Sequence, residues 1–251
     1  MSCLSRAVAA LCTGVLLAAS ALAQSDERTS ETNARAWYMY FGDHPLGDGP
    51  WGLHFDGQLR MEGAFDRRKQ LLLRPGVNYD VSDNVQLSGG YAFIDTKGPE
   101  DSPPGFDVPE NRFWEQLILK QRLGSTRLVH RYRLEQRFVG DISENDDGEG
   151  ELRAYTYLNR FRYFLKGVVP LGADLRYFAA FYNELMIGFG DNVRNNIFDQ
   201  NRSYAAFGIR FGTDASLEIG YLLQIVQHPS GALLEYNHAF QIAFFSSWRL
   251  D

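Results

Sequence analysis

The chain has 251 residues, a length that one large domain can fill, and its 31 Asp and Glu outnumber its 25 Lys and Arg, giving a formal net charge of −6. This balance offers no excess of basic charge for binding nucleic acid, so we expect no nucleic-acid partner. The two cysteines, Cys3 and Cys12, both lie near the N-terminus, and disulfides therefore cannot hold the rest of the chain together.

The N-terminal segment has the pattern of a secretory signal peptide. Arg6 supplies a positive charge, residues 7–19 are largely apolar, and Ala21-Leu22-Ala23 provides a small-x-small cleavage site. The apolar run is shorter than the roughly 20 residues that a spanning helix needs, which argues against a membrane anchor. We therefore expect a cleaved signal peptide over residues 1–23 and a mature domain over residues 24–251.

Most of the remaining chain alternates between apolar and polar residues, which is the period of a β-strand. In residues 126–138, for example, Tyr132 and Leu134 share one face, whereas Arg131 and Arg133 share the other. Similar segments recur, and most are as long as the ~9–11 residues of a tilted transmembrane strand. We expect ten strands, over residues 51–62, 68–80, 85–95, 111–122, 126–139, 152–165, 174–187, 202–211, 216–226 and 236–248.

The connections between these strands alternate in length. Turns are short at residues 81–84, 123–125 and 212–215 and somewhat longer at 166–173, whereas long polar connections occupy residues 95–110, 140–151, 188–201 and 227–235. Outer-membrane barrels have short periplasmic turns and long external loops. The long set is therefore expected outside the cell, which puts the C-terminus in the periplasm.

Trp37–Phe41 is a further strand-like piece, the eleventh. Single-chain bacterial barrels have even numbers of strands. We therefore expect this piece either to lie in the lumen or at the periplasmic rim, or to be accompanied by an unrecognised twelfth strand.

Alternation alone does not tell which face of a barrel points inward. A soluble barrel of the lipocalin kind would enclose the aromatic side chains and expose the charged ones. A membrane barrel is favoured because the aromatic side chains are too many for one interior, several lie near strand ends, and the connections alternate in length. The predicted fold class is all-β, a transmembrane antiparallel up-and-down β-barrel of about 10–12 strands in the outer membrane of a Gram-negative bacterium. The alternative is a soluble periplasmic β-barrel that acts as a binding module.

Several motifs, in order along the chain, resemble those of a known family. They are Leu73-Arg74-Pro75-Gly76-Val77-Asn78-Tyr79, Gly90-Tyr91-Ala92, Glu110-Asn111-Arg112-Phe113-Trp114-Glu115-Gln116-Leu117, Arg131-Tyr132-Arg133-Leu134-Glu135-Gln136-Arg137, Asn201-Arg202-Ser203-Tyr204 and Gly220-Tyr221-Leu222. Their order and spacing, over roughly residues 37–248, are similar to those of domain-of-unknown-function family 2490 (DUF2490). The resemblance implies an outer-membrane β-barrel, and it implies no activity and no functional residues.

A set of charged side chains is expected to face the barrel lumen. By parity these are Asp56, Arg60, Arg74, Arg131, Arg133, Glu135, Arg137, Arg160, Arg162, Glu184, Arg210 and Glu218. They either fill the lumen as a network of ion pairs, because buried charges must be paired, or line a narrow pore that prefers anions because arginines predominate. Strand 111–122 is ambiguous. Its Arg112, Gln116 and Lys120 can all face inward only if Glu115 faces lipid.

An enzyme is not expected from these residues. An outer-membrane lipid hydrolase would need Ser, His and a carboxylate or amide together at the bilayer surface, and no Gly-x-Ser-x-Gly motif is present. The nearest candidate is His238 with Glu235 and Asn237, and a surface-lipid-modifying enzyme is kept as an alternative function. The acidic loop at residues 141–149 lacks the EF-hand register, so we expect no metal and no other cofactor.

The predicted function is that of a narrow porin-like channel or of a structural protein of the outer membrane. The expected partners are outer-membrane lipid, lipopolysaccharide and, during biogenesis, the barrel-assembly machinery. The sequence indicates neither a solute nor an oligomeric state.

Processing and location can be tested together. Because cleavage is expected after Ala23, intact mass spectrometry of the protein expressed with its leader in a Gram-negative host should give a mature chain that begins at Gln24. The same protein should fractionate with the outer membrane. Recovery in the soluble periplasmic fraction after osmotic shock would contradict the membrane barrel.

Overall fold

Eleven β-strands account for most of the chain that the computed structural model describes, which is residues 29–98, 105–173, 175–193 and 195–251. In chain order they are β1 (Thr29–Pro45), β2 (Trp51–Glu62), β3 (Arg67–Ser82), β4 (Val85–Thr96), β5 (Val108–Leu123), β6 (Thr126–Glu144), β7 (Gly150–Leu171), β8 (Tyr177–Phe189), β9 (Phe198–Phe211), β10 (Ala215–Gln227) and β11 (Leu233–Ser246). The ten predicted strands are all present, as β2 to β11. In these ranges no helix is long and apolar enough to cross a bilayer.

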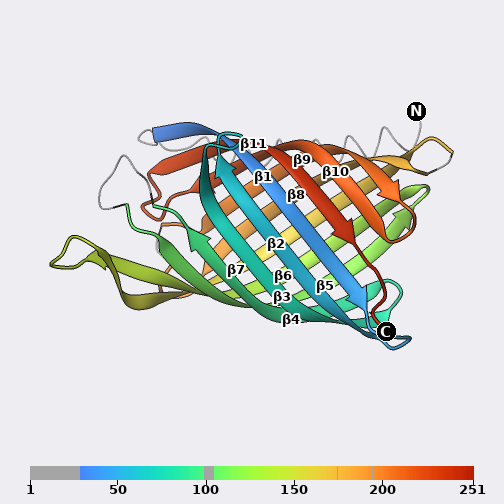
Figure 1. Ribbon diagram of the computed structural model, residues 1–251, viewed down its shortest axis with the longest axis horizontal. Coiled ribbons are helices and arrows are strands. Elements are labelled where there is room, and N and C mark those ends of the chain that lie inside the picture. Colours follow the sequence, from blue (N-terminus) through green and yellow to red (C-terminus); the bar gives the residue numbers. More distant parts are fainter. Residues whose placement is uncertain (1–28, 99–104, 174, 194) are drawn as a thin grey trace.

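The strands form one closed barrel in the order β1-β11-β10-β9-β8-β7-β6-β5-β4-β3-β2 (Figure 1). Strands that follow one another in the chain pair in antiparallel fashion. The barrel closes where β1 pairs in parallel with β11, from Thr29 opposite Leu233 to Gly42 opposite Ser246. The predicted up-and-down β-barrel is therefore confirmed, with one parallel seam.

The strand count is odd within the described residues, so the expectation of an even number is wrong. Residues 37–41 lie in the middle of β1, a full strand of the barrel wall, and they are neither a lumenal piece nor the companion of a twelfth strand. Even numbers follow from antiparallel closure, because the first and last strands then run in opposite directions. In this barrel β1 and β11 run in the same direction, and parallel closure of an up-and-down barrel requires an odd number.

Short turns gather at the end of the barrel where the C-terminus lies. The turn between β5 and β6 has only two residues between the paired Leu123 and Thr126. Gly124 in that turn has a φ of 59°, a left-handed conformation that glycine adopts without a steric penalty. We call this end of the barrel the short-turn end.

At the opposite end β6 and β7 continue past the barrel wall as a paired ribbon (Figure 1). The tip of this ribbon is residues 145–149, so most of the predicted loop at 140–151 is strand. The predicted connection at 166–173 is also mostly strand, because β7 runs to Leu171. In both places a strand paired with its neighbour continues through residues that do not alternate regularly between apolar and polar.

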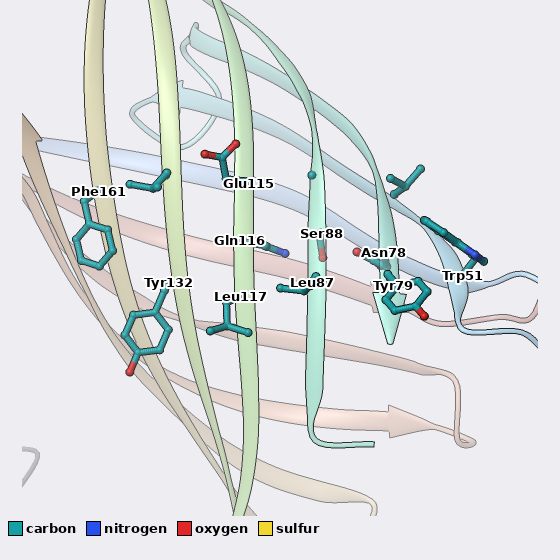
Figure 2. Close-up of a pocket in the computed structure, with 13 residues that line it drawn as sticks. Trp51, Asn78, Tyr79, Leu87, Ser88, Glu115, Gln116, Leu117, Tyr132 and Phe161 are labelled. Carbon is teal, nitrogen blue, oxygen red and sulfur yellow. The ribbon is translucent and has the colours of Figure 1, made fainter. Parts of the chain in front are cut away.

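Apolar side chains cover the outside of the barrel wall, and charged side chains face inward. Phe113 on the outer face is 56% exposed, whereas the inward-facing Arg133 is 1% exposed. Figure 2 shows the alternation on β5, where Glu115 and Gln116 lie on opposite sides of the strand. This arrangement is the inverse of that in a soluble barrel, whose interior holds the apolar side chains.

One large apolar side chain, that of Trp114, lies inside the barrel against β3 and β4. It is 2% exposed and packs with Leu72, Ala92 and Ile94. The indole ring lies so close to the backbone that a Cβ at Gly76 would be 2.5 Å from its Cζ2 atom. At the adjacent position of β4, a Cβ on Gly90 would be 2.3 Å from the carbonyl oxygen of Pro75. Glycine is therefore required where β3 and β4 pass beneath the ring.

The substitution Gly90→Ala tests this packing. Its added Cβ overlaps backbone atoms of β3, so we expect the free energy of unfolding in urea to fall by about 1–3 kcal/mol, the usual cost of overpacking. Gly167→Ala is the matched control, because the nearest atom to its Cβ is Leu128 Cδ2 at 3.6 Å, an ordinary contact. Equal urea midpoints for the two variants would contradict the packing described here.

Candidate functional site in the barrel lumen

The side chains predicted to line the lumen differ in what they contact. Nine of them join one continuous network of ion pairs: Asp56, Arg74, Arg131, Arg133, Glu135, Arg137, Arg160, Arg162 and Glu184. Glu218 instead pairs with Lys166 at 2.6 Å. Arg60 donates to Gln58 and Gln70. Arg210 packs on the ring of Phe178.

The centre of the network is the carboxylate of Glu135 on β6, whose side chain is fully buried. Its Oε2 atom accepts hydrogen bonds from Arg160 Nη2 at 2.5 Å and Nε at 2.9 Å, and its Oε1 atom accepts one from Arg162 Nη1 at 2.6 Å. Three further guanidinium groups have a nitrogen 3.6 to 4.0 Å from it, those of Arg112, Arg74 and Arg133. A buried carboxylate is tolerated only when its lone pairs are satisfied, and here Arg160 and Arg162 do so by hydrogen bonds, while the other three arginines add electrostatic attraction at longer distance.

A second carboxylate, that of Glu184 on β8, connects the network to the next strands. Its Oε1 atom accepts hydrogen bonds from Arg131 Nη2 at 2.7 Å and from Arg162 Nη2 at 2.6 Å. Arg202 Nη1 on β9 lies 3.4 Å from its Oε2 atom. Arg162 therefore joins the two carboxylates directly.

Three further carboxylates complete the network. Glu110 on β5 accepts from Arg112 and from Arg137, the latter at 2.6 Å. Asp199 accepts from Arg160 Nη1 at 2.6 Å. Asp56 accepts from Arg74 Nη1 at 2.6 Å. We call the whole set the ion-paired layer: Asp56, Arg74, Glu110, Arg112, Arg131, Arg133, Glu135, Arg137, Arg160, Arg162, Glu184, Asp199 and Arg202.

Contacts of the ion-paired layer cross the lumen rather than only following its wall. Arg74 on β3 reaches to 3.9 Å from Glu135 on β6, although two strands separate them. Arg160 on β7 reaches Asp199 on β9, one strand away. The exposed fractions of these side chains are 10% or less. Charged side chains of the layer therefore extend into the middle of the lumen.

Four residues of this region were not predicted from the sequence: Glu110, Lys166, Asp199 and Arg202. Arg202 has the same parity as Arg210 on the same strand, so parity could have found it. Lys166 has the parity of Arg162, but it was assigned to a turn. Asp199 follows a register shift between β8 and β9, which parity cannot anticipate.

The ambiguity of residues 111–122 is also resolved. Arg112 and Gln116 are buried in the lumen, and Glu115 lies on the outer face. Its carboxylate accepts a hydrogen bond from Gln136 Nε2 at 3.1 Å, which reduces the cost of an outward carboxylate. Glu115 borders a groove of about 560 Å³ on the outer wall (Figure 2). The lining of this groove is mainly apolar, so we assign it to the outer face and not to the site.

A cavity of about 320 Å³ occupies the lumen on the short-turn side of the ion-paired layer. Arg74, Arg162 and Glu184 of the layer line its inner part. Lys120 and Arg127, which flank the turn between β5 and β6, line its mouth. Arg127 is exposed to solvent, so the cavity is reached from the short-turn end.

The candidate hydrolase group is not assembled. His238 Nδ1 lies 2.5 Å from the hydroxyl of Tyr221, and both side chains are exposed on the outer wall. Glu235 and Asn237 instead accept hydrogen bonds from Arg35. The barrel wall therefore separates the histidine from its proposed carboxylate and amide.

A different cluster on the outer wall was not predicted. Ser246 Oγ lies 2.8 Å from the hydroxyl of Tyr40, which lies 3.1 Å from His44 Nε2. His44 Nδ1 lies 2.9 Å from the carbonyl oxygen of Trp248. These contacts satisfy each polar group locally, and Ser246 is only 4% exposed. The cluster links β1 to β11 at the parallel seam near the C-terminus. The absence of enzymatic activity stays a prediction.

Comparison with known proteins gives a relative, a solved structure and a family. The chain is 24% identical over 238 residues to an uncharacterised protein of Methylorubrum extorquens, covering 93% of this chain and 97% of that protein. The solved structure of the NanC porin matches with a TM-score of 0.44 and 10% identity, covering 79% of this chain and 90% of that one. Residues 34–235 match the family described as "Protein of unknown function (DUF2490)". The resemblance seen in the motifs is thereby confirmed, and the chain belongs to the DUF2490 family.

Proposed function

We propose that the protein is an outer-membrane β-barrel, exported with a cleaved signal peptide, that acts as a narrow porin-like channel for small anions and is closed at rest by the ion-paired layer. The observation that carries this proposal is the buried Glu135 carboxylate, which Arg160 and Arg162 of the adjacent strand bind and which Arg74 approaches to 3.9 Å from β3. An ion that passes through the barrel must pass this layer.

The outer wall supports the membrane location. Large apolar side chains such as Phe207 (54% exposed) and Phe240 (51% exposed) cover it. Apolar surface in water costs roughly 25 cal/mol per Å², and a bilayer removes this cost. In a soluble periplasmic binding module this exposed apolar surface would lower the stability of the folded state. The apolar outer face and charged inner face of the barrel therefore favour a membrane protein over that alternative.

The charge of the layer supports a preference for anions. Eight arginines face five carboxylates within it, so its formal charge is positive. A charged ring in a channel attracts ions of the opposite sign and excludes ions of its own sign. Any path that opens through the layer is therefore lined mainly by guanidinium groups.

The proposed function can be tested by planar-bilayer conductance of the refolded protein. The wild type should show little steady current, because the layer fills the lumen. Glu135→Gln should produce a steady current that prefers anions, because five arginines lose their shared carboxylate and repel one another. It should also lower the free energy of unfolding by about 3–5 kcal/mol, the cost of breaking buried pairs.

Glu115→Gln is the matched control for this test. It makes the same chemical change on the neighbouring strand, but on the outer wall, so it should leave the wild-type current unchanged. A large steady current through the wild type would contradict closure by the layer. Identical behaviour of the Glu135→Gln and Glu115→Gln variants would show that the layer does not control the lumen.

The orientation can be tested with epitope tags on intact cells. A tag after Asp146, at the tip of the β6–β7 ribbon, should bind antibody without permeabilisation, because long connections of outer-membrane barrels face the medium. A tag after Gly124, in the two-residue turn, should bind only after permeabilisation. The reverse pattern would show that the barrel is inserted the other way round.

A further inference from the structure

The cavity at the short-turn end has more positive than negative charge in its lining. Seven basic side chains line it: Arg74, Lys120, Arg127, Arg131, Arg162, Lys166 and Arg202. Four carboxylates line it: Asp43, Asp56, Glu184 and Glu218. The formal excess of three positive charges favours a negatively charged occupant.

Two of these cations have no carboxylate partner. Within the described ranges no carboxylate oxygen lies within 4.0 Å of the Lys120 ammonium or the Arg127 guanidinium, in contrast to Lys166, which pairs with Glu218. Lys120 and Arg127 lie on neighbouring strands at the mouth of the cavity. They make the entrance positively charged, and an incoming anion would have no close ion pair of theirs to break.

Deeper in the cavity, buried polar atoms lack hydrogen-bond partners. The Nε–H groups of Arg74 and Arg202 make no hydrogen bond, and these side chains are 3% and 7% exposed. Both residues line the cavity. A buried donor without a partner costs about 1–3 kcal/mol, so these atoms favour an occupant that supplies acceptors.

The same cavity also has an apolar wall, which a site for a small inorganic ion would not need. Five aromatic side chains line it: Trp37, Phe41, Phe164, Tyr182 and Phe245. Aliphatic side chains lie among them, including Ile118 and Val129. Cationic side chains lie over three of these rings, those of Trp37, Phe164 and Phe245. An occupant with an apolar body would cover the apolar surface that these cations leave exposed to water.

We infer that this cavity binds an organic carboxylate with an aromatic or alkyl body, which enters from the short-turn end. The carboxylate would meet the unpaired cations and the unpartnered buried donors, and the body would cover the aromatic wall. A cavity of about 320 Å³ lies near the lower limit of small-molecule sites, which selects a small organic acid over an oligosaccharide or a peptide. The inference deepens the proposed function, on which it rests, by naming the class of anion that the lumen receives.

The first experiment compares three probes by isothermal titration calorimetry on the refolded full-length barrel in detergent. They are 1-naphthaleneacetate, which has both parts, acetate, which has only the carboxylate, and 2-(1-naphthyl)ethanol, which has only the body. We expect saturable one-to-one binding for 1-naphthaleneacetate, and affinities at least about tenfold weaker for the other two, equivalent to 1.4 kcal/mol or more. A blank with empty micelles corrects for partition into detergent. Equal heats from the protein and the blank for 1-naphthaleneacetate would overturn the inference.

The second experiment locates the site with variants outside the ion-paired layer. Lys120→Gln and Arg127→Gln should each raise the Kd of 1-naphthaleneacetate about three- to tenfold, because each removes an unpaired cation. Ile118→Thr should also weaken it, while leaving the weak binding of acetate unchanged. Arg153→Gln, on the exposed β6–β7 ribbon, is the control and should change nothing. Unchanged affinity in all three cavity variants would place the binding elsewhere and overturn the inference.

Failure of this inference is distinguishable from failure of the proposed function. If the wild type conducts freely but binds 1-naphthaleneacetate through Lys120 and Arg127, the closed layer is wrong and the site stands. If the wild type is closed but binds none of the three probes, the layer stands and the site is wrong.

Discussion

The buried carboxylate of Glu135 and the arginines around it are the interaction on which the interior of this barrel depends. Each arginine near this carboxylate extends from the barrel wall into the lumen and loses contact with water. Its buried charge is stable only because Glu135 and neighbouring carboxylates pair with it. Because some of the ion pairs join strands that are not adjacent, they stabilise the barrel from inside, where a soluble protein would have an apolar core. Loss of one carboxylate therefore affects several strands at once.

This interior also constrains the register of every strand. A shift of one residue would turn the inward charges of a strand toward the outer wall and its aromatic side chains into the lumen. The parallel seam is part of the same constraint, because it places Trp37 of β1 inside, where Arg60 and Arg202 lie over its ring at 4.1 and 5.0 Å. The motifs that carry the family resemblance supply many residues of the layer, including Glu110, Arg112 and Arg202.

The sequence predicted the parts of this structure that depend on alternation alone. Residues 126–138 have a strict period of two, so their inward face, with Arg133 and Glu135, followed from parity. Asp199 could not be predicted, because its place depends on a shift in pairing between two strands. The parallel closure of β1 on β11 could not be predicted either, because it pairs strands far apart in the sequence and no local motif indicates it. The cavity could not be predicted because residues from many strands line it. Whether its cations have carboxylate partners depends on which side chains lie near them in the folded barrel.

The measurement that tests the central claim most directly is a double-mutant cycle on Glu135 and Arg162. The free energy of unfolding would be measured for the wild type, Glu135→Gln, Arg162→Gln and the double variant under one set of detergent conditions. If the two side chains are a buried pair at the centre of the layer, the two single losses should be coupled by about 1–3 kcal/mol. Additivity to within about 0.5 kcal/mol would contradict the account, because the two side chains would then not stabilise the barrel as an interacting pair.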